Sequence, residues 1–173
     1  MSACIKAGIV GGIILFIWYA VSWMVLPWHA STLNGFKDEK AVSEVIIANA
    51  PQSGIYLLPS AQMSSQEQSP EMVMFASVHQ VGTQSMMMQG AVSLVTQIIS
   101  ALLVAWLLCK TAGLGYAGRV GFVVVFALAA SFVSHVPYWN WFYFNSQFTL
   151  VQVADLLVGW FLAGLVMAKM CVR

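Results

Sequence analysis

The chain has 173 residues, of which 60% are hydrophobic and only 8% are charged, and its formal net charge is +1. Soluble globular domains carry charges on about a quarter of their residues, so this composition excludes a soluble domain. The few scattered basic residues give no support to nucleic-acid binding. We therefore predict a protein whose main partner is the lipid bilayer.

Four apolar runs are long enough to cross a membrane: Ala7–Pro27, Gln89–Cys109, Arg119–Val136 and Phe148–Met170. About 20 residues at ~1.5 Å each cover the ~30 Å hydrocarbon core. Backbone that faces lipid must satisfy its own hydrogen bonds, so spans of this length are expected to be α-helices. The sequence predicts an all-α four-helix membrane bundle, with residues 1–173 forming one membrane domain and 28–88 a small external cap.

The first span contains small residues at helical spacing. Gly8 and Gly12 form a G-x-x-x-G pattern, and Ala7 and Gly11 form a second small pair. Such spacing allows another helix to approach closely. No small-residue cleavage site follows this span, so we expect it to remain as an uncleaved anchor.

The cap is predicted to contain a short helix and two strands. Asp38–Asn49 has the pattern of an amphipathic helix. Gly54–Leu58 and Met72–Val78 are apolar runs bounded by turn-forming residues, which is typical of strands. The Ser/Gln-rich stretch Ser60–Ser69 between them is expected to be mobile. A helix and a two-stranded hairpin are too small to be stable alone, so we expect the cap to pack on the bundle.

Basic residues gather at one side of the predicted bundle. The residues flanking that side are Lys6, Lys110, Arg119, Lys169 and Arg173. Only Lys37 and Lys40 lie on the other side, in the cap. The positive-inside rule therefore predicts cytoplasmic N and C termini, with residues 28–88 outside.

All three cysteines, Cys4, Cys109 and Cys171, lie at predicted cytoplasmic ends of the spans. None lies in the external segment, so no structural disulfide is expected there. Their spacing matches no zinc or redox motif.

The segment between the third and fourth spans is rich in aromatic residues. Pro137 follows the third predicted span, and we expect Tyr138–Phe144 to form a loop. Tyr and Trp gather at membrane interfaces, so this loop is expected to anchor the helices there.

Polar side chains recur at the same predicted depth in all four spans: Tyr19, Ser22, Ser93, Gln97, Ser131, His135, Gln152 and Asp155. Gly159 and Ala163 follow Asp155 at intervals of four, so the carboxyl is expected to face another helix. Carboxylates inside membranes are usually functional.

We therefore predict an outward-facing polar pocket around Asp155, which binds a ligand with help from His135, Gln97, Ser93, Ser131, Tyr19 and Gln152. The simplest state of the carboxyl is a neutral acid hydrogen-bonded to Gln97, Ser93 or Tyr19. The alternative is a hydrogen-bond network that only holds the bundle together.

A metal or haem site is a second hypothesis. His29, His79 and His135 lie at or beyond the predicted outer face, and methionines are found in the same region: Met63, Met72, Met74, Met86, Met87 and Met88. Thioether sulfur suits Cu(I), and imidazole suits copper, zinc or haem iron. The spacing matches no known ligand motif, so the sequence itself identifies no cofactor.

Catalytic motifs are missing from the sequence. It has no Gly-x-Ser-x-Gly, Ser-x-x-Lys or His-Glu-x-x-His pattern. Asp155 and His135 could form an acid–base pair, which leaves a small proton-coupled transporter and a membrane-embedded enzyme as further alternatives. The leading prediction is a non-enzymatic accessory or ligand-binding membrane protein that self-associates or joins a larger complex.

Three short stretches carry a family resemblance: W-M-V-L-P-W-H at 23–29, G-I-Y-L-L-P at 54–59 and D-x-x-x-G-W at 155–160. Together they resemble a family of small, functionally uncharacterised bacterial four-span integral membrane proteins. The resemblance covers most of the chain. It implies a bacterial inner-membrane protein with this topology, and it implies no activity, ligand or cofactor.

Overall fold

The computed structural model describes residues 3–60, 72–82, 85–111 and 113–171. The chain forms two compact units, of which the first comprises Met1–Leu33 and Met86–Arg173 and the second comprises Asn34–Ser85. Each unit has its own internal packing.

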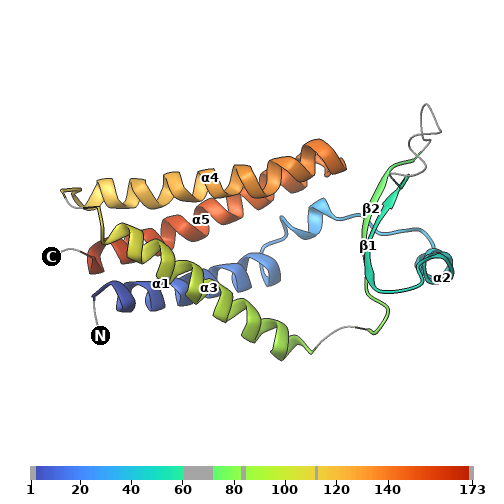
Figure 1. The fold of residues 1–173 in the computed structure, drawn as a ribbon, viewed down its shortest axis with the longest axis horizontal. Coiled ribbons are helices and arrows are strands. Elements are labelled where there is room, and N and C mark those ends of the chain that lie inside the picture. Colours follow the sequence, from blue (N-terminus) through green and yellow to red (C-terminus); the bar gives the residue numbers. More distant parts are fainter. Residues whose placement is uncertain (1–2, 61–71, 83–84, 112, 172–173) are drawn as a thin grey trace. The chain divides into compact units, whose positions relative to one another are not determined.

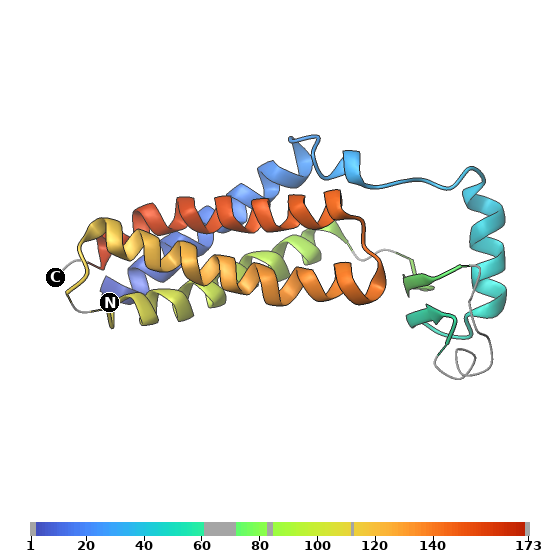
Figure 2. The same ribbon diagram turned by 90° about the horizontal axis from the view of Figure 1, so that it is seen from above.

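The first unit is a bundle of four long helices, namely α1 (Ala3–Met24), α3 (Met86–Leu108), α4 (Tyr116–Phe142) and α5 (Ser146–Met170) (Figure 1). Each of these helices is long and apolar enough to cross a membrane. The two views in Figures 1 and 2 show both chain ends and the α3–α4 connection at the same end of the bundle. The predicted all-α bundle of four candidate spans is confirmed.

The helix α1 is central, because it packs against both α3 and α5, while α4 packs mainly on α5. A Cβ atom added at Gly8 would lie 2.7 Å from the Leu102 Cα, and one added at Gly12 would lie 2.5 Å from the Ile98 Cα. The α1 backbone therefore rests directly on the α3 backbone. The G-x-x-x-G pattern therefore allows the close helix contact that its spacing predicts.

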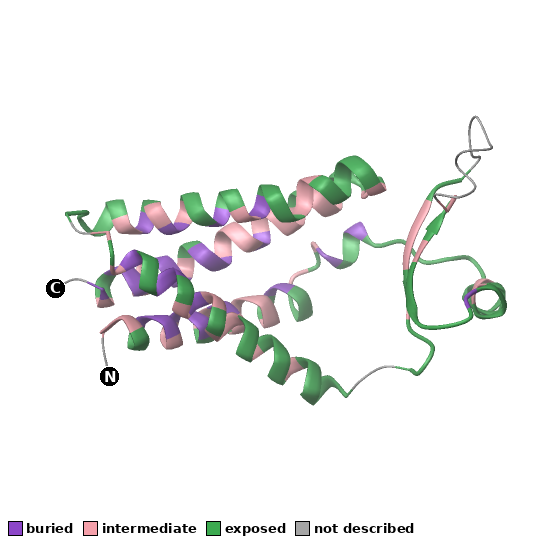
Figure 3. Cartoon of the chain, in the orientation of Figure 1, coloured by how far each residue is buried: buried purple, intermediate pink, exposed green. Residues whose placement is uncertain are grey.

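Burial follows the faces of the helices that look into the bundle (Figure 3). Buried side chains include Leu15, Val104, Val123 and Met167, one from each helix. Large apolar side chains on the outer faces, such as those of Ile17, Leu103, Val125 and Leu150, are exposed. Apolar residues on both the inner and outer faces are what a bundle surrounded by lipid requires.

The helix α4 is longer than the sequence predicted. It continues through Pro137 to Phe142, so the expected loop at Tyr138–Phe144 is mostly helical. Pro137 cannot donate its one backbone hydrogen bond, but it lies near the helix end, where that loss interrupts little of the helix. The helix ends at Tyr143, which adopts the left-handed conformation and donates its N–H to the Tyr138 carbonyl.

The second unit contains α2 (Glu39–Asn49) and an antiparallel hairpin of β1 (Gly54–Leu58) and β2 (Met74–Val78). Gly54 pairs with Val78, and Leu58 pairs with Met74. The Asp38 side chain caps α2 by accepting the Ala41 N–H at 2.9 Å. The predicted helix and both strands are confirmed, with β2 starting two residues later than expected.

The apolar face of α2 lines a cavity of about 710 Å³ together with both strands. Residues 61–69 of the predicted mobile loop lie outside the described residues. Packing of this unit on the bundle stays a prediction.

The close α1–α3 contact can be tested by replacing Gly12 with alanine. In Gly12→Ala, the new methyl group would press on the Ile98 backbone, which cannot move aside as a flexible side chain would. We expect a loss of about 1–3 kcal/mol in unfolding free energy, measured by thermal melting in detergent micelles.

Gly121 in α4 is the matched control, because nothing lies within 4 Å of a Cβ atom added there. Gly121→Ala should leave the melting temperature unchanged or raise it slightly, since Ala favours helix more than Gly. Equal melting temperatures for the two variants would contradict the backbone contact.

Candidate functional site: a buried histidine–aspartate pair

Asp155 lies on α5 in the bundle interior, with only 1% of its surface exposed. One turn further along, Gly159 leaves room for the Trp18 side chain of α1, because a Cβ atom there would lie 2.8 Å from the Trp18 Cδ1. The face of α5 that carries Asp155 and Gly159 therefore packs against another helix, as predicted. Trp18 is thereby held directly over the carboxyl group.

Both oxygens of the Asp155 carboxyl are hydrogen-bonded. The Trp18 indole Nε1–H donates to Oδ1 at 2.7 Å and also reaches the Asp155 backbone carbonyl at 3.0 Å. The His29 Nε2 lies 3.1 Å from Oδ2. Hydrogen bonds to a carboxylate are stronger than those between neutral groups, so these two contacts offset much of the cost of burying it.

His29 reaches Asp155 because the chain turns back on itself after α1. The helix ends at Met24, and a turn leads into the short 3-10 helix η1 (Ala30–Thr32). The His29 side chain is 2% exposed. Its backbone carbonyl accepts the Thr32 hydroxyl at 2.8 Å, and the Thr32 carbonyl accepts the Asn145 side-chain amide at 3.2 Å. The turn after α1 is thus tied to the α4–α5 connection.

A second layer of groups surrounds the imidazole of His29. The Ser22 Oγ lies 3.0 Å from Nε2, and the Trp28 indole donates to the same Oγ at 2.9 Å. The Trp23 ring stacks on the imidazole at a centroid distance of 3.8 Å and an angle of 11°. The Trp28 ring meets it edge-on at 5.6 Å. Aromatic faces and a carboxylate both interact favourably with a positively charged imidazole.

The second ring nitrogen of His29, Nδ1, is buried and has no hydrogen-bond partner among the described residues. The pair can therefore be neutral overall in two ways, as an imidazolium with a carboxylate or as a neutral imidazole with a carboxylic acid. The two states differ only by the position of one proton between Nε2 and Oδ2. The arrangement therefore allows a proton to transfer between these two atoms.

The structure corrects two expectations about Asp155. Its ionisable partner is His29, which comes from the turn after α1, and not His135. Its hydrogen-bond donors are Trp18 and His29, in place of the expected Gln97, Ser93 or Tyr19. His29 lies just outside the first predicted span, and Trp18, which lies within that span, was not considered as a donor.

The other predicted site residues are spread over the bundle. Tyr19 lies close enough to Asp155 for an electrostatic interaction. Ser131 is buried and donates its hydroxyl to the Ala127 carbonyl of its own helix. His135, Gln97 and Gln152 are half-buried, and Ser93 is exposed. Asp155 lines neither the cavity beside α2 nor the cavity lined by Lys110 and Arg119. An open ligand pocket around Asp155 therefore stays a prediction.

A signal for the two partners of Asp155, Trp18 and His29, is present in the sequence. Trp18 and Ser22 are four residues apart, so they share one face of α1 and meet the same partner. Trp28 and His29 follow Pro27, which favours a turn, and a turn at this point can return both side chains to that face. The sequence alone does not say in which direction such a turn runs.

The predicted metal ligands belong to two different units of the chain. His79 is exposed in the second unit, whereas His29 and His135 belong to the first. Across the described part of the chain, no group of three or more His, Cys, Asp or Glu side chains could hold a metal ion. Met72 and Met74 line the apolar cavity beside α2, and Met86–Met88 are exposed in the first turn of α3. Met63 lies outside the described residues.

Comparison with known proteins adds no relative. No family model, no curated protein and no solved structure matches the chain. The resemblance to small bacterial membrane proteins therefore stays a prediction, and the function has to be argued from the site itself.

The role of Trp18 can be tested by removing its N–H while keeping an aromatic ring. Trp18→Phe leaves the Oδ1 of Asp155 without its donor in the bundle interior. We expect a loss of about 1–3 kcal/mol in unfolding free energy, seen as a lower melting temperature in micelles. Trp141 is 73% exposed, so Trp141→Phe should melt like the wild type. A Trp18→Phe protein as stable as this control would refute the proposed hydrogen bond.

Proposed function

We propose that this protein is a non-enzymatic, multi-pass protein of a bacterial cytoplasmic membrane whose ligand at the His29–Asp155 pair is a proton. In this proposal the protein acts as an accessory component, either in self-association or within a larger membrane complex. The observation that carries the proposal is the buried imidazole of His29, held between the Trp23 ring and the Asp155 carboxyl. The alternatives with a transported substrate or a catalysed reaction have no comparable geometric support.

A proton at this pair would affect the turn after α1. His29 holds Pro27–Leu33 against the bundle through Asp155 and Ser22, and this stretch leads directly into the second unit. With His29 charged, the contact to the carboxylate is an ion pair; with His29 neutral, it is at most a hydrogen bond. Protonation is thus expected to strengthen the attachment of the turn.

Among the described residues, the titratable group in contact with the imidazole is Asp155 from α5, and Tyr19 of α1 lies near that carboxyl. No Lys or Arg is within salt-bridge distance of Asp155 among the described residues. Within the described part of the chain, His29 is therefore the basic group paired with this carboxyl.

The proposed orientation places both chain ends in the cytoplasm and Asn34–Ser85 outside. In support, Lys6 lies near the start of α1, Lys110 just after α3, Arg119 in the first turn of α4 and Lys169 in the last turn of α5. Figures 1 and 2 show these four helix ends at the same end of the bundle. Basic residues near span ends favour the cytoplasmic side. The His29–Asp155 pair then lies in the outer half of the membrane, where it would respond to external pH.

The orientation predicts the activity of fused reporters. Alkaline phosphatase, which is active only outside the cytoplasm, should be active when fused after Gln52 and inactive when fused after Gly113. A green fluorescent protein, which fluoresces only when folded inside, should show the reverse. Phosphatase activity at Gly113 would overturn the orientation and also move the His29–Asp155 pair to the inner half.

Proton binding can be followed by tryptophan fluorescence. A charged imidazole quenches an indole stacked on it, whereas a neutral imidazole does not. Raising the pH until the imidazole of His29 loses its charge should therefore increase the emission of the purified protein in micelles. The increase should be absent in His29→Gln, which removes the titrating ring, and in Trp23→Phe, which removes the reporter.

Asp155→Asn is the matched variant for the carboxyl. The amide can still accept from Trp18 and can donate to a neutral His29, so the fold should persist while the carboxylate is lost. We expect the fluorescence change of this variant to differ from that of the wild type, because the charged imidazole loses its ion-pair partner. A wild-type emission that does not change with pH, or a change that persists in His29→Gln, would refute the proposal.

A further inference from the structure

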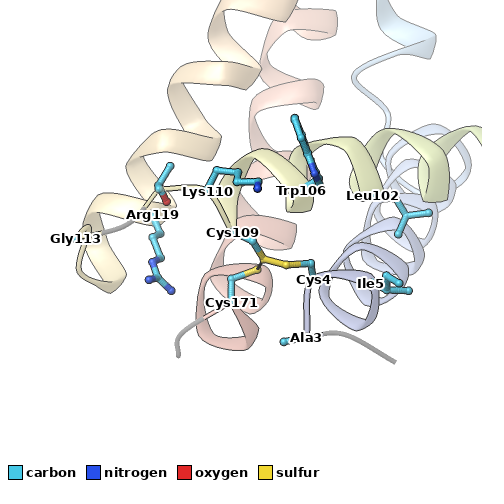
Figure 4. Close-up of a pocket in the computed structure, with 11 residues that line it drawn as sticks. Ala3, Cys4, Ile5, Leu102, Trp106, Cys109, Lys110, Gly113, Arg119 and Cys171 are labelled. Carbon is cyan, nitrogen blue, oxygen red and sulfur yellow. Dashed lines mark hydrogen bonds between the residues drawn. A yellow bond between two sulfur atoms is a disulfide. The ribbon is translucent and has the colours of Figure 1, made fainter.

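The opposite end of the bundle from His29 contains a cavity of about 760 Å³ (Figure 4). It is lined by the beginning of α1, the end of α3, the α3–α4 connection, the first turn of α4 and the residue after α5. Binding sites for small molecules commonly have volumes of about 300–1,000 Å³. The cavity is therefore large enough for a small organic ligand.

The three cysteines of the chain meet in this cavity. Cys4 and Cys109 form a disulfide between α1 and α3, and both are half-buried at the cavity wall. The Cys171 Sγ lies 3.0 Å from the Cys109 Sγ. A sulfur atom in a disulfide carries no hydrogen, so the thiol of Cys171 is the donor in this contact. Figure 4 shows the Cys171 side chain reaching Cys109 from the side away from Cys4.

The cavity is positively charged. Lys110 and Arg119 line it, and no Asp or Glu is among its described lining residues. The Lys110 Nζ lies 5.8 Å from the Trp106 ring centroid. The Nε and Nη1 atoms of Arg119 are buried and have no hydrogen-bond partner among the described residues. Buried guanidinium donors without partners are costly, and carboxylates are their usual acceptors.

The proposed orientation puts this disulfide in the cytoplasm, where disulfides are rare and mostly take part in redox reactions. The expectation of a redox role rests on the proposed orientation, whereas the chemistry of the cavity does not depend on it.

We propose that the cavity binds a low-molecular-mass thiol that carries a carboxylate or another anionic group, and that this thiol reduces the Cys4–Cys109 disulfide. The anionic group binds Arg119 and Lys110, which brings the thiol to the half-buried disulfide. The site is distinct from the His29–Asp155 pair at the other end of α1.

The reaction takes place in two exchange steps. The thiolate of the first ligand molecule attacks the Cys4 Sγ, forms a mixed disulfide with Cys4 and breaks the Cys4–Cys109 bond. The electron pair of that bond goes to the Cys109 Sγ, which then takes up a proton. A second thiolate attacks the ligand sulfur of the mixed disulfide and releases Cys4 as a thiolate, which is protonated by solvent. Two thiols are oxidised to one small disulfide, and the protein disulfide is reduced to two thiols.

Cys171 assists the departure of Cys109. Burial raises the pKa of the Cys171 thiol, and the nearby Arg119 acts weakly in the opposite direction. The thiol therefore keeps its proton at neutral pH and can donate a hydrogen bond to the leaving sulfur. A leaving thiolate that is stabilised in this way departs faster.

The test uses the full-length oxidised protein in detergent micelles and two thiol probes. The probes are 2-mercaptoethanesulfonate, which is anionic, and 2-mercaptoethanol, which is neutral. The rate is the loss of the Cys4–Cys109 linkage, measured by alkylation and peptide mass mapping. Comparing each variant with the wild type for each probe cancels the intrinsic reactivity of the two thiols.

Removing the guanidinium should affect only the anionic probe. We expect Arg119→Gln to slow reduction by the anionic probe about tenfold and reduction by the neutral probe by less than about twofold. Lys169→Gln removes a charge at the same end of the bundle from a residue that does not line the cavity, and it should leave both rates unchanged. Equal slowing of both probes by Arg119→Gln, or slowing of neither, would overturn the anion site. A peptide map of the oxidised protein without a Cys4–Cys109 linkage would overturn the whole proposal.

The role of Cys171 is tested with two variants. Cys171→Ala removes the donor and should slow reduction by both probes, whereas Cys171→Ser keeps a hydroxyl donor and should recover most of the rate. A purely structural role for this side chain would give no such recovery. Equal rates for the two variants would overturn the assignment of Cys171 as the donor.

Discussion

A buried carboxyl group determines much of the architecture of the bundle. Asp155 is almost completely covered, and a carboxyl group surrounded by apolar side chains is costly unless each oxygen has a donor. Its own helix cannot supply these donors, because the backbone N–H groups there are already used. The donors come from α1 and from the turn after it, in the form of the Trp18 indole and the His29 imidazole. Association of α1 with α5 and folding of the turn are therefore coupled to one side chain.

The small residues of the bundle serve the same arrangement. Gly159 provides the space in which Trp18 lies over Asp155, and Gly8 and Gly12 let α3 lie directly against α1. Because lipid is as apolar as Leu or Val, burial of apolar side chains drives helix association only weakly in a membrane. Close packing at glycines and hydrogen bonds between helices have to supply specificity. The His29–Asp155 pair and the glycine contacts together supply this specificity.

The parts of the structure that depend on local pattern could be predicted from the sequence. Length and composition predicted the four spans, and spacing predicted that the Asp155–Gly159 face packs on another helix. The partner of Asp155 could not be predicted, because His29 reaches it through a turn whose direction depends on contacts such as that between Asn145 and Thr32. The extension of α4 was missed because a proline commonly ends a helix, whereas here the helix continues through Pro137 to Phe142.

The helix α1 links two chemically different regions of the protein. Near its first residues, Cys4 connects it covalently to α3, and near its last turn Trp18 and Ser22 connect it to the His29–Asp155 pair. The glycine contacts that hold α1 on α3 lie between these two ends. Reduction of the disulfide would remove one constraint on α1 but would leave the backbone packing at Gly8 and Gly12 in place. Because the positions of helices with such close contacts are set by packing, each end can change its chemical state while the bundle keeps its form.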